Sequence, residues 1–244
     1  DVRNEISTNE EYDLIINTVK LYDFDSILNQ IIKKVKNNFI LLPFQNGIYS
    51  EEKIKNLLGI KKTYGAVAQI SSVINSKNEI DHKGKLATFF VGPYNRLKDD
   101  KLIKFCLDCQ NVGLDIRYSE NIEQKIWDKF IFLSAYSGLT TLTEKTIGEI
   151  FVNTILKKKF IGAMLETYKL SLLFGIKFKI NPVDKWIEKI SSMPYEMTSS
   201  MFHDFKAKKK LELKWLSGFV VSNGREKDME CPIHTEIVKE IESR

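Results

Sequence analysis

Two apolar runs, LIINTV at residues 14–19 and FILLPF at residues 39–44, decide the fold class of this 244-residue chain. Both runs are short and nearly continuous, which is typical of strands covered on both faces. Between them, apolar residues recur at helical spacing, at Phe24, Ile27, Leu28, Ile31, Ile32 and Val35. The order strand, helix, strand predicts a right-handed parallel crossover, the unit of doubly wound sheets.

The α/β pattern continues from this crossover as far as Asn121. Gln45, Asn46 and Gly47 end the second strand, and a short helix runs from Ser50 to about Gly59. Residues 65–74 and 86–91 predict hairpin strands that close the sheet, with the polar residues 75–84 as their turn. A helix capped by Asp99 and ended by Gly113 precedes a last strand at residues 114–118.

Long helical patterns replace the strands after Asn121. Four of the predicted helices cover residues 122–142, 147–174, 211–223 and 234–241. Two more begin at Asn181 and at Thr198. The sequence therefore predicts two domains, an α/β domain over residues 1–121 and an all-α domain over residues 122–244.

Composition argues against several partners. The net charge of +5 comes from lysines scattered among acids, and the basic residues 206–210 lack an aromatic platform, so we expect no nucleic-acid partner. No apolar run approaches the roughly 20 residues of a membrane helix, and no secretion signal is recognisable. We expect a cytoplasmic protein without a membrane partner.

The cysteines and histidines do not suggest a metal or redox centre. Cys106 and Cys109 form one CxxC within an apolar helical pattern, which favours burial as small apolar residues, and Cys231 is distant in sequence. His82, His203 and His234 are dispersed, so we predict no metal site.

Several polar strings occur in an informative order along the chain. They are Val19-Lys20, FQNG at residues 44–47, DHKG at 81–84, WDK at 127–129, SSMFHD at 199–204 and Leu211-Glu212. In this order and spacing, the chain resembles the ketopantoate reductase (2-dehydropantoate 2-reductase) family over nearly its whole length.

The resemblance implies an NADPH-dependent oxidoreductase of pantothenate biosynthesis. Residues 1–121 would be an incomplete, Rossmann-like dinucleotide-binding domain, and residues 122–244 a helical substrate-binding domain that also forms a homodimer. The reaction would reduce 2-dehydropantoate, or a related small α-keto acid, to the 2-hydroxy acid.

The same resemblance assigns the catalytic residues. Lys129 matches the family's catalytic lysine, and a lysine suits the reaction because hydride addition to a carbonyl carbon leaves negative charge on oxygen. Glu212 matches a glutamate on the coenzyme side, where it orients the lysine or a ribose hydroxyl. Taken alone, Lys129 is more simply interpreted as a solvated lysine on a helix that also carries Lys125.

The remaining assignments concern binding. Ser200 matches a serine that binds the substrate carboxylate, and Asn46 an asparagine where coenzyme and substrate meet. Lys20 and Ser71 match coenzyme contacts. The simpler interpretations are a local helix cap for Ser200 and a turn residue for Asn46.

The chain departs from the family at two places. Leu133, Ser137 and Ile147 stand where the family has substrate-binding asparagines, so we expect a changed substrate. No GxGxxG occurs, and Asp1 is followed by a polar stretch to Glu11, so we expect weak coenzyme affinity and an incomplete portion of a longer reductase. The alternative is a non-catalytic member that serves as a dimerisation or ligand-sensing module.

Overall fold

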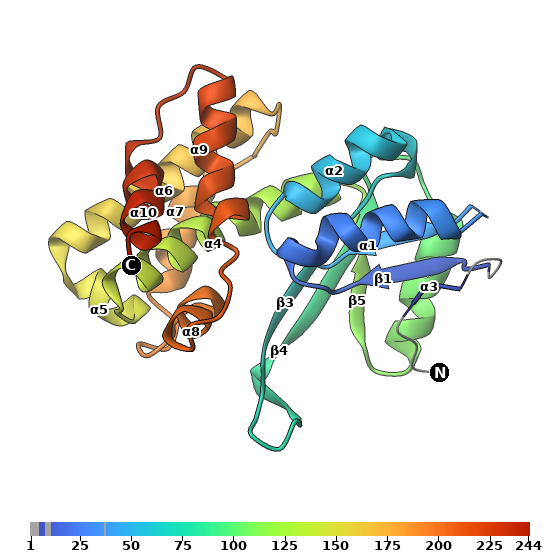
Figure 1. The fold of residues 1–244 in the computed structure, drawn as a ribbon, viewed down its shortest axis with the longest axis horizontal. Coiled ribbons are helices and arrows are strands. Elements are labelled where there is room, and N and C mark those ends of the chain that lie inside the picture. The colour runs from blue at the N-terminus through green and yellow to red at the C-terminus, as the bar shows by residue number, and fades with distance from the viewer. Residues whose placement is uncertain (1–4, 8–10, 37) are drawn as a thin grey trace. The chain divides into compact units, whose positions relative to one another are not determined.

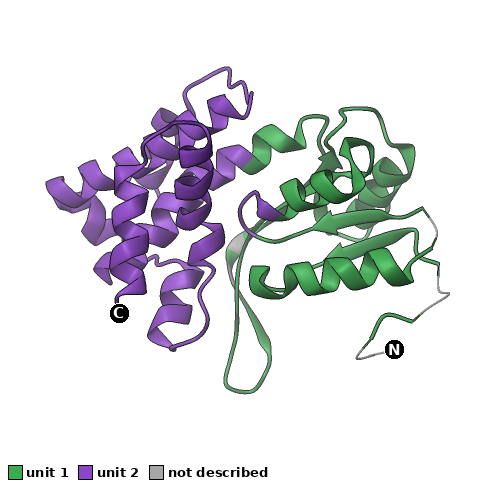
Figure 2. Cartoon of the chain, turned by 45° about the horizontal axis from the view of Figure 1, so that its top comes forward, with its two compact units in different colours: residues 1–45, 50–126 green, residues 46–49, 127–244 purple. Residues whose placement is uncertain are grey.

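The computed structural model describes residues 5–7, 11–36 and 38–244. Most of the polar opening stretch therefore lies outside the described residues. The chain forms two compact units, which Figure 2 colours separately: residues 1–45 with 50–126, and residues 46–49 with 127–244. The first is an α/β unit and the second is helical, which confirms the predicted fold class.

The predicted crossover is present in unit 1. Strands β1 (Leu14–Asn17) and β2 (Ile40–Pro43) pair in parallel, and helix α1 (Leu21–Lys34) connects them (Figure 1). The helix buries one face, formed by Leu21, Phe24, Leu28 and Ile31. These positions recur every three or four residues, so the apolar spacing in the sequence accounts for the packing.

A long hairpin forms a second ladder in unit 1. Strands β3 (Tyr64–Ile74) and β4 (Ile80–Pro93) are antiparallel, and β5 (Asp115–Tyr118) adds to β4 in parallel. Among the described residues, these strands form a sheet separate from β1 and β2, whereas the sequence suggested a single sheet. The turn is also shorter than predicted, because pairing with β3 extends β4 back to Ile80.

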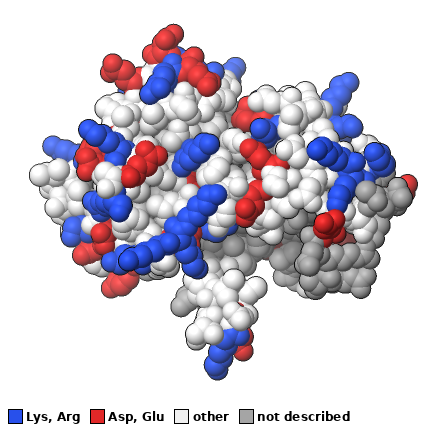
Figure 3. Space-filling view, in the orientation of Figure 1, with Lys and Arg blue, Asp and Glu red and all other residues white. Residues whose placement is uncertain are grey.

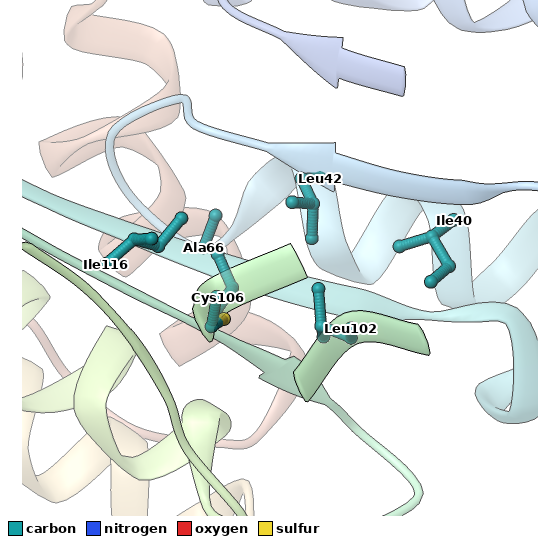
Figure 4. Packing of buried hydrophobic residues seen from close by; sticks show 7 residues of the cluster. Ile40, Leu42, Ala66, Leu102, Cys106 and Ile116 are labelled. Carbon is teal, nitrogen blue, oxygen red and sulfur yellow. The ribbon is translucent and has the colours of Figure 1, made fainter. Parts of the chain in front are cut away.

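Three shorter helices complete unit 1: α2 (Tyr49–Leu58), whose first residue belongs to unit 2, the 3-10 turn η1 (Ile60–Lys62) and α3 (Asp100–Asn111). Asp99 caps α3 as predicted, because its carboxylate accepts the backbone N–H of Leu102. Cys106 of α3 packs with Leu42, Ala66 and Ile116 in the core shown in Figure 4. Burial raises the pKa of its thiol to about 11, so Cys106 behaves as a small apolar residue, as expected.

Unit 2 is built from helices. Helix α4 (Ile122–Thr143) begins in unit 1 and enters unit 2 at Trp127. The elements that follow are α5 (Ile147–Val152), α6 (Thr154–Leu173), α7 (Pro182–Ile190), α8 (Ser200–Lys206), η2 (Leu213–Trp215), α9 (Ser217–Glu226) and α10 (Pro232–Glu242). Among the described residues, every helix is too short or too polar to cross a membrane.

Capping side chains explain two of the three places where these helices differ from prediction. Residues 147–174 are two helices, because the Asn153 side chain accepts from the backbone N–H groups of Ile155 and Leu156 and starts a new helix. Helix α8 begins at Ser200 with Ser199 as its cap, two residues after Thr198. The predicted helix 211–223 is divided into η2 and α9.

A buried histidine ties three helices of unit 2 together. His234 of α10 is fully buried, and its Nε2 lies 3.0 Å from Thr167 Oγ1 and 3.1 Å from the Ala163 carbonyl of α6. Thr167 in turn bonds to Ser134 of α4 at 2.8 Å. Burial disfavours the charged imidazole and lowers the pKa of His234 to about 4.

Unfolding should therefore become easier in mild acid. Unfolded chains bind a proton at His234 near its ordinary pKa of 6.5, whereas the folded protein does so only near 4. The stabilisation is complete above pH 6.5 and is lost as pH falls towards 4, by about 3 kcal/mol in all. Urea denaturation at pH 7 and pH 4.5 measures this loss.

His234→Gln should remove that part of the pH dependence, because the amide does not titrate. His203→Gln, at an exposed position, is the control and should keep the wild-type slope. Equal slopes for the wild type and His234→Gln would contradict the assignment.

Candidate active site

Gln45 fixes the carboxyl ends of β1 and β2 in unit 1. Its buried Nε2 donates to Asn17 Oδ1 at 2.8 Å, to the Val19 carbonyl at 2.9 Å and to the Asn17 carbonyl at 3.2 Å. Parallel strands bring their carboxyl ends to one edge, which is where open α/β sheets bind ligands. Sequence reasoning treated Gln45 only as a turn residue, although its place directly before Asn46 was a usable signal.

The two predicted coenzyme contacts of unit 1 lie in different settings. Lys20 lies after β1 and directly precedes α1, and its side chain is half-buried. Its carbonyl accepts a hydrogen bond from the Asp23 N–H at 2.9 Å. Ser71 lies in the exposed second half of β3, at the irregularity between Ile70 and Ser72. Lys20 is thus near the carboxyl end of β1, whereas Ser71 is on the outer part of the hairpin.

Unit 2 brings together two predicted residues that are 83 positions apart. Lys129 Nζ donates a hydrogen bond of 2.8 Å to Asn46 Oδ1. Asn46 lies on the loop between β2 and α2, and Lys129 on α4. Both side chains are half-buried, so the ammonium group is partly shielded from water and held in one direction.

The neighbours of Lys129 anchor α4 in the core. Trp127 is fully buried against the rings of Phe130, Phe174 and Phe219. The Asp128 carboxylate pairs with Lys185 at 2.7 Å, and its carbonyl accepts from the Trp186 indole at 2.8 Å. Because the two preceding side chains are engaged with the protein, the WDK string sets the orientation of Lys129.

Gly47 allows the Asn46 loop to pack against the segment that follows Glu212. It has φ of +94°, and a Cβ there would lie 3.3 Å from the Trp215 carbonyl and 3.7 Å from the Phe130 ring. The Glu212 carbonyl accepts from Trp215 N at 3.0 Å, and the Glu212 side chain is buried. Asn46 is thus adjacent to Gly47, Glu212 is three residues before Trp215, and Lys129 is adjacent to Phe130.

Ser200 is at the exposed start of α8, and the capping role belongs to its neighbour. Ser199 Oγ accepts from Phe202 N at 3.1 Å and bonds to Thr140 Oγ1 of α4 at 2.8 Å. Thr140 follows Lys129 by eleven residues, so it faces the same side of α4, about 16 Å along the helix. Sequence reasoning missed Ser199, because adjacent serines offer two equivalent caps.

Basic and acidic side chains are intermingled on the face in Figure 3. Lys206 pairs with Glu144 at 2.9 Å, and Arg244 lies 3.6 Å from the same carboxylate. Within the described part of the chain, no group of three His, Cys, Asp or Glu side chains is arranged to hold a metal ion.

Replacing Gly47 tests the loop contact. Gly47→Ala strains a left-handed backbone and crowds the Trp215 carbonyl, whereas Gly59→Ala strains a backbone with φ of +80° and open space around it. Each should lower the free energy of unfolding by about 1 kcal/mol, with roughly 1 kcal/mol more for Gly47→Ala. Urea denaturation measures both, and equal losses would rule out a role for the contact.

Comparisons with known proteins identify the family. The description "Ketopantoate reductase PanE/ApbA" matches residues 2–96, and its C-terminal counterpart matches residues 121–244. The 2-dehydropantoate 2-reductase of Pyrococcus horikoshii is 28% identical over 222 residues, covering 91% of this chain and 72% of the relative. The oxidoreductase YkpB of Bacillus subtilis is 23% identical over 228 residues, covering 91% of this chain and 74% of the relative.

Solved structures share the fold. D-mandelate dehydrogenase, in a ternary structure with NADH and anilino(oxo)acetate, has a TM-score of 0.85 at 19% identity and covers 98% of this chain and 77% of its own. Dimeric ketopantoate reductase from Staphylococcus aureus has a TM-score of 0.81 at 22% identity. The match covers 96% of this chain and 77% of the Staphylococcus aureus chain. Because the family matches extend over both units, the chain belongs to the ketopantoate reductase family of oxidoreductases.

Proposed function

We propose that this chain reduces 2-dehydropantoate, or a related small α-keto acid, to the 2-hydroxy acid with NADPH as hydride donor. The observation that carries the proposal is the 2.8 Å hydrogen bond from Lys129 Nζ to Asn46 Oδ1. It directs a half-buried ammonium group, which can stabilise the negative charge that develops on oxygen during carbonyl reduction. Membership of an oxidoreductase family supports the same chemistry.

Lys129 would act on the ketone oxygen. Hydride addition forms a C–H bond and moves the carbonyl π electrons onto oxygen, where negative charge develops. The Lys129 ammonium stabilises that charge through a hydrogen bond and then transfers a proton to the oxygen, completing the hydroxyl group. Asn46 keeps the ammonium in place, and solvent restores the proton.

The carboxyl edge of β1 and β2 fits the polar groups of a nicotinamide coenzyme. Asn17 Nδ2 and Gln45 Oε1 are buried there without a hydrogen-bond partner among the described residues, so a donor and an acceptor remain to be satisfied. Lys20 follows Val19, whose carbonyl accepts from Gln45, and its cationic side chain would suit a phosphate. When bound, the coenzyme supplies the hydride.

The other binding roles follow from position. Ser200 carries an exposed hydroxyl on the helix that docks at Thr140, on the Lys129 side of α4, and would donate to the substrate carboxylate. The buried Glu212 would orient Lys129 or accept from a ribose hydroxyl. Ser71, on the outer hairpin, is proposed as a coenzyme contact by family resemblance alone.

Substitution of Lys129 tests the chemistry. Lys129→Met should lower kcat/KM for keto-acid reduction by about 10²- to 10⁴-fold, because proton donation and charge stabilisation are both lost. Lys214→Met, at an exposed lysine of the same unit, should leave it unchanged. Loss of NADPH absorbance in stopped-flow mixing measures both. Full activity of Lys129→Met would remove the lysine from the mechanism.

Coenzyme titration tests the binding half of the proposal. We expect NADPH to bind more tightly than NADH, and Lys20→Ala to weaken NADPH binding about tenfold, because a charge-assisted contact to phosphate is lost. Nicotinamide fluorescence reports both dissociation constants. Absence of binding by the wild-type chain would defeat the coenzyme assignment and favour the non-catalytic alternative.

We also propose that the chain forms a homodimer. The Staphylococcus aureus relative is described as dimeric. Here Leu165 and Leu172 are exposed seven residues apart on α6, as on a helix that packs against another surface. Light scattering should give twice the monomer mass of 28.3 kDa, whereas the monomer mass would refute the proposal.

A further inference from the structure

We infer, resting on the proposed function, that the Tyr136 hydroxyl group donates a hydrogen bond to the carboxylate of the 2-keto acid whose ketone Lys129 protonates. Tyr136 lies on α4, seven residues after Lys129. The inference adds a substrate-binding residue to the Lys129 site, so that two side chains of one helix bind neighbouring oxygen atoms of a small substrate.

The buried hydroxyl of Tyr136 has an unused capacity for hydrogen bonding. The side chain is 6% exposed, and the hydroxyl has no partner among the described residues. A buried hydroxyl in this state destabilises the fold, so groups of this kind are ordinarily satisfied by protein, by water or by a ligand. Burial also raises the pKa of Tyr136, so the group keeps its proton and can donate to an anion.

Helix geometry places Tyr136 on the same side of α4 as Lys129. At about 100° per residue, seven residues leave the two side chains roughly 20° apart in rotation and about 10 Å apart along the helix. Side chains on a helix tilt towards its amino end, which for Tyr136 is the direction of Lys129. Two hydrogen bonds of about 2.8 Å, with a 2-keto acid between them, span most of that separation.

Aromatic stacking holds the Tyr136 ring in one orientation. The Phe132 ring stacks on the Tyr136 ring with centroids 5.0 Å apart, and on the Trp186 ring of α7 at 4.5 Å. All three side chains are buried. The hydroxyl oxygen is itself shielded from solvent, so neighbouring side chains must move apart when the substrate binds. Because the ring is already ordered, the contact costs little conformational entropy.

The start of α8 lies beside the same turn of α4. Thr140 Oγ1 donates to the Tyr136 carbonyl at 2.6 Å and bonds to Ser199 Oγ at 2.8 Å. Ser200, the proposed carboxylate contact, directly follows Ser199. Because a carboxylate accepts hydrogen bonds on both of its oxygens, Tyr136 and Ser200 can bind the same group while the ketone faces Lys129.

Removal of the hydroxyl tests the inference. Tyr136→Phe keeps the ring and should lower kcat/KM for 2-dehydropantoate with NADPH by about 10- to 100-fold, because a hydrogen bond to a charged group is lost. The loss should appear in KM, since the contact is already made to the bound substrate, whereas Lys129→Met should act on kcat. Calorimetry with pantoate, the corresponding 2-hydroxy acid, should show a similar loss of affinity without turnover.

Urea denaturation distinguishes a substrate contact from a structural one. Tyr136→Phe should raise the urea midpoint by roughly 0.5 M, because it removes an unsatisfied buried group. If the hydroxyl were instead bonded to an internal water, its removal would lower the midpoint.

Tyr94→Phe is the matched control. The Tyr94 hydroxyl, in unit 1, is also buried without a partner among the described residues. Its removal should raise the urea midpoint in the same way and leave the affinity for pantoate unchanged.

Pantoamide, in which a neutral amide replaces the carboxylate of pantoate, tests which part of the ligand Tyr136 contacts. Hydrogen bonds to charged groups are stronger than hydrogen bonds to neutral ones, so Tyr136→Phe should reduce the ratio of pantoate affinity to pantoamide affinity by about three- to tenfold. Equal losses for both ligands would assign the hydroxyl to another part of the substrate and overturn the inference.

The outcomes separate the two proposals. Wild-type kcat/KM and pantoate affinity in Tyr136→Phe, a lowered urea midpoint, or failure of this variant to fold would overturn the inference while leaving the reductase activity standing. If the wild-type chain neither reduces 2-dehydropantoate nor binds pantoate, the proposed function loses its named substrate, and the inference fails with it.

Discussion

The hydrogen bond between Lys129 and Asn46 is the interaction on which the candidate site depends. A lysine on a helix surface is ordinarily solvated and mobile, and such a group stabilises developing charge poorly because it must be reorganised each time. The 2.8 Å bond to Asn46 Oδ1 gives the ammonium group a fixed direction. Everything proposed for substrate binding starts from that direction.

Both partners of this bond are held by apolar packing and backbone shape. Trp127 fixes the rotation of α4 within a cluster of aromatic rings. Gly47 adopts a conformation that brings the Asn46 loop against the Trp215 carbonyl, and a larger residue would strain it. Gln45, one residue earlier, is tied to the end of β1 by three hydrogen bonds. The polar site is therefore precise because its supports are rigid.

Several buried polar groups of unit 2 hold its helices together. Ser134, Thr167 and His234 bond to one another or to backbone, and so join α4, α6 and α10. Thr140 and Ser199 join α4 to α8. These groups stabilise the fold, whereas the buried Tyr136 hydroxyl of α4 has no hydrogen-bond partner among the described residues.

The sequence by itself determined the element types and the fold class, because apolar periodicity records which faces are buried, and caps such as Asp99 are local. Motif order also named Lys129, Asn46 and Glu212, whose roles remain predictions. Only the tertiary structure decided which distant residues meet, including Asn46 with Lys129 and Ser199 with Thr140. It also decided the break at Asn153 and the separate β3–β5 ladder. Periodicity describes a segment's own faces, whereas these features depend on the partner each face finds.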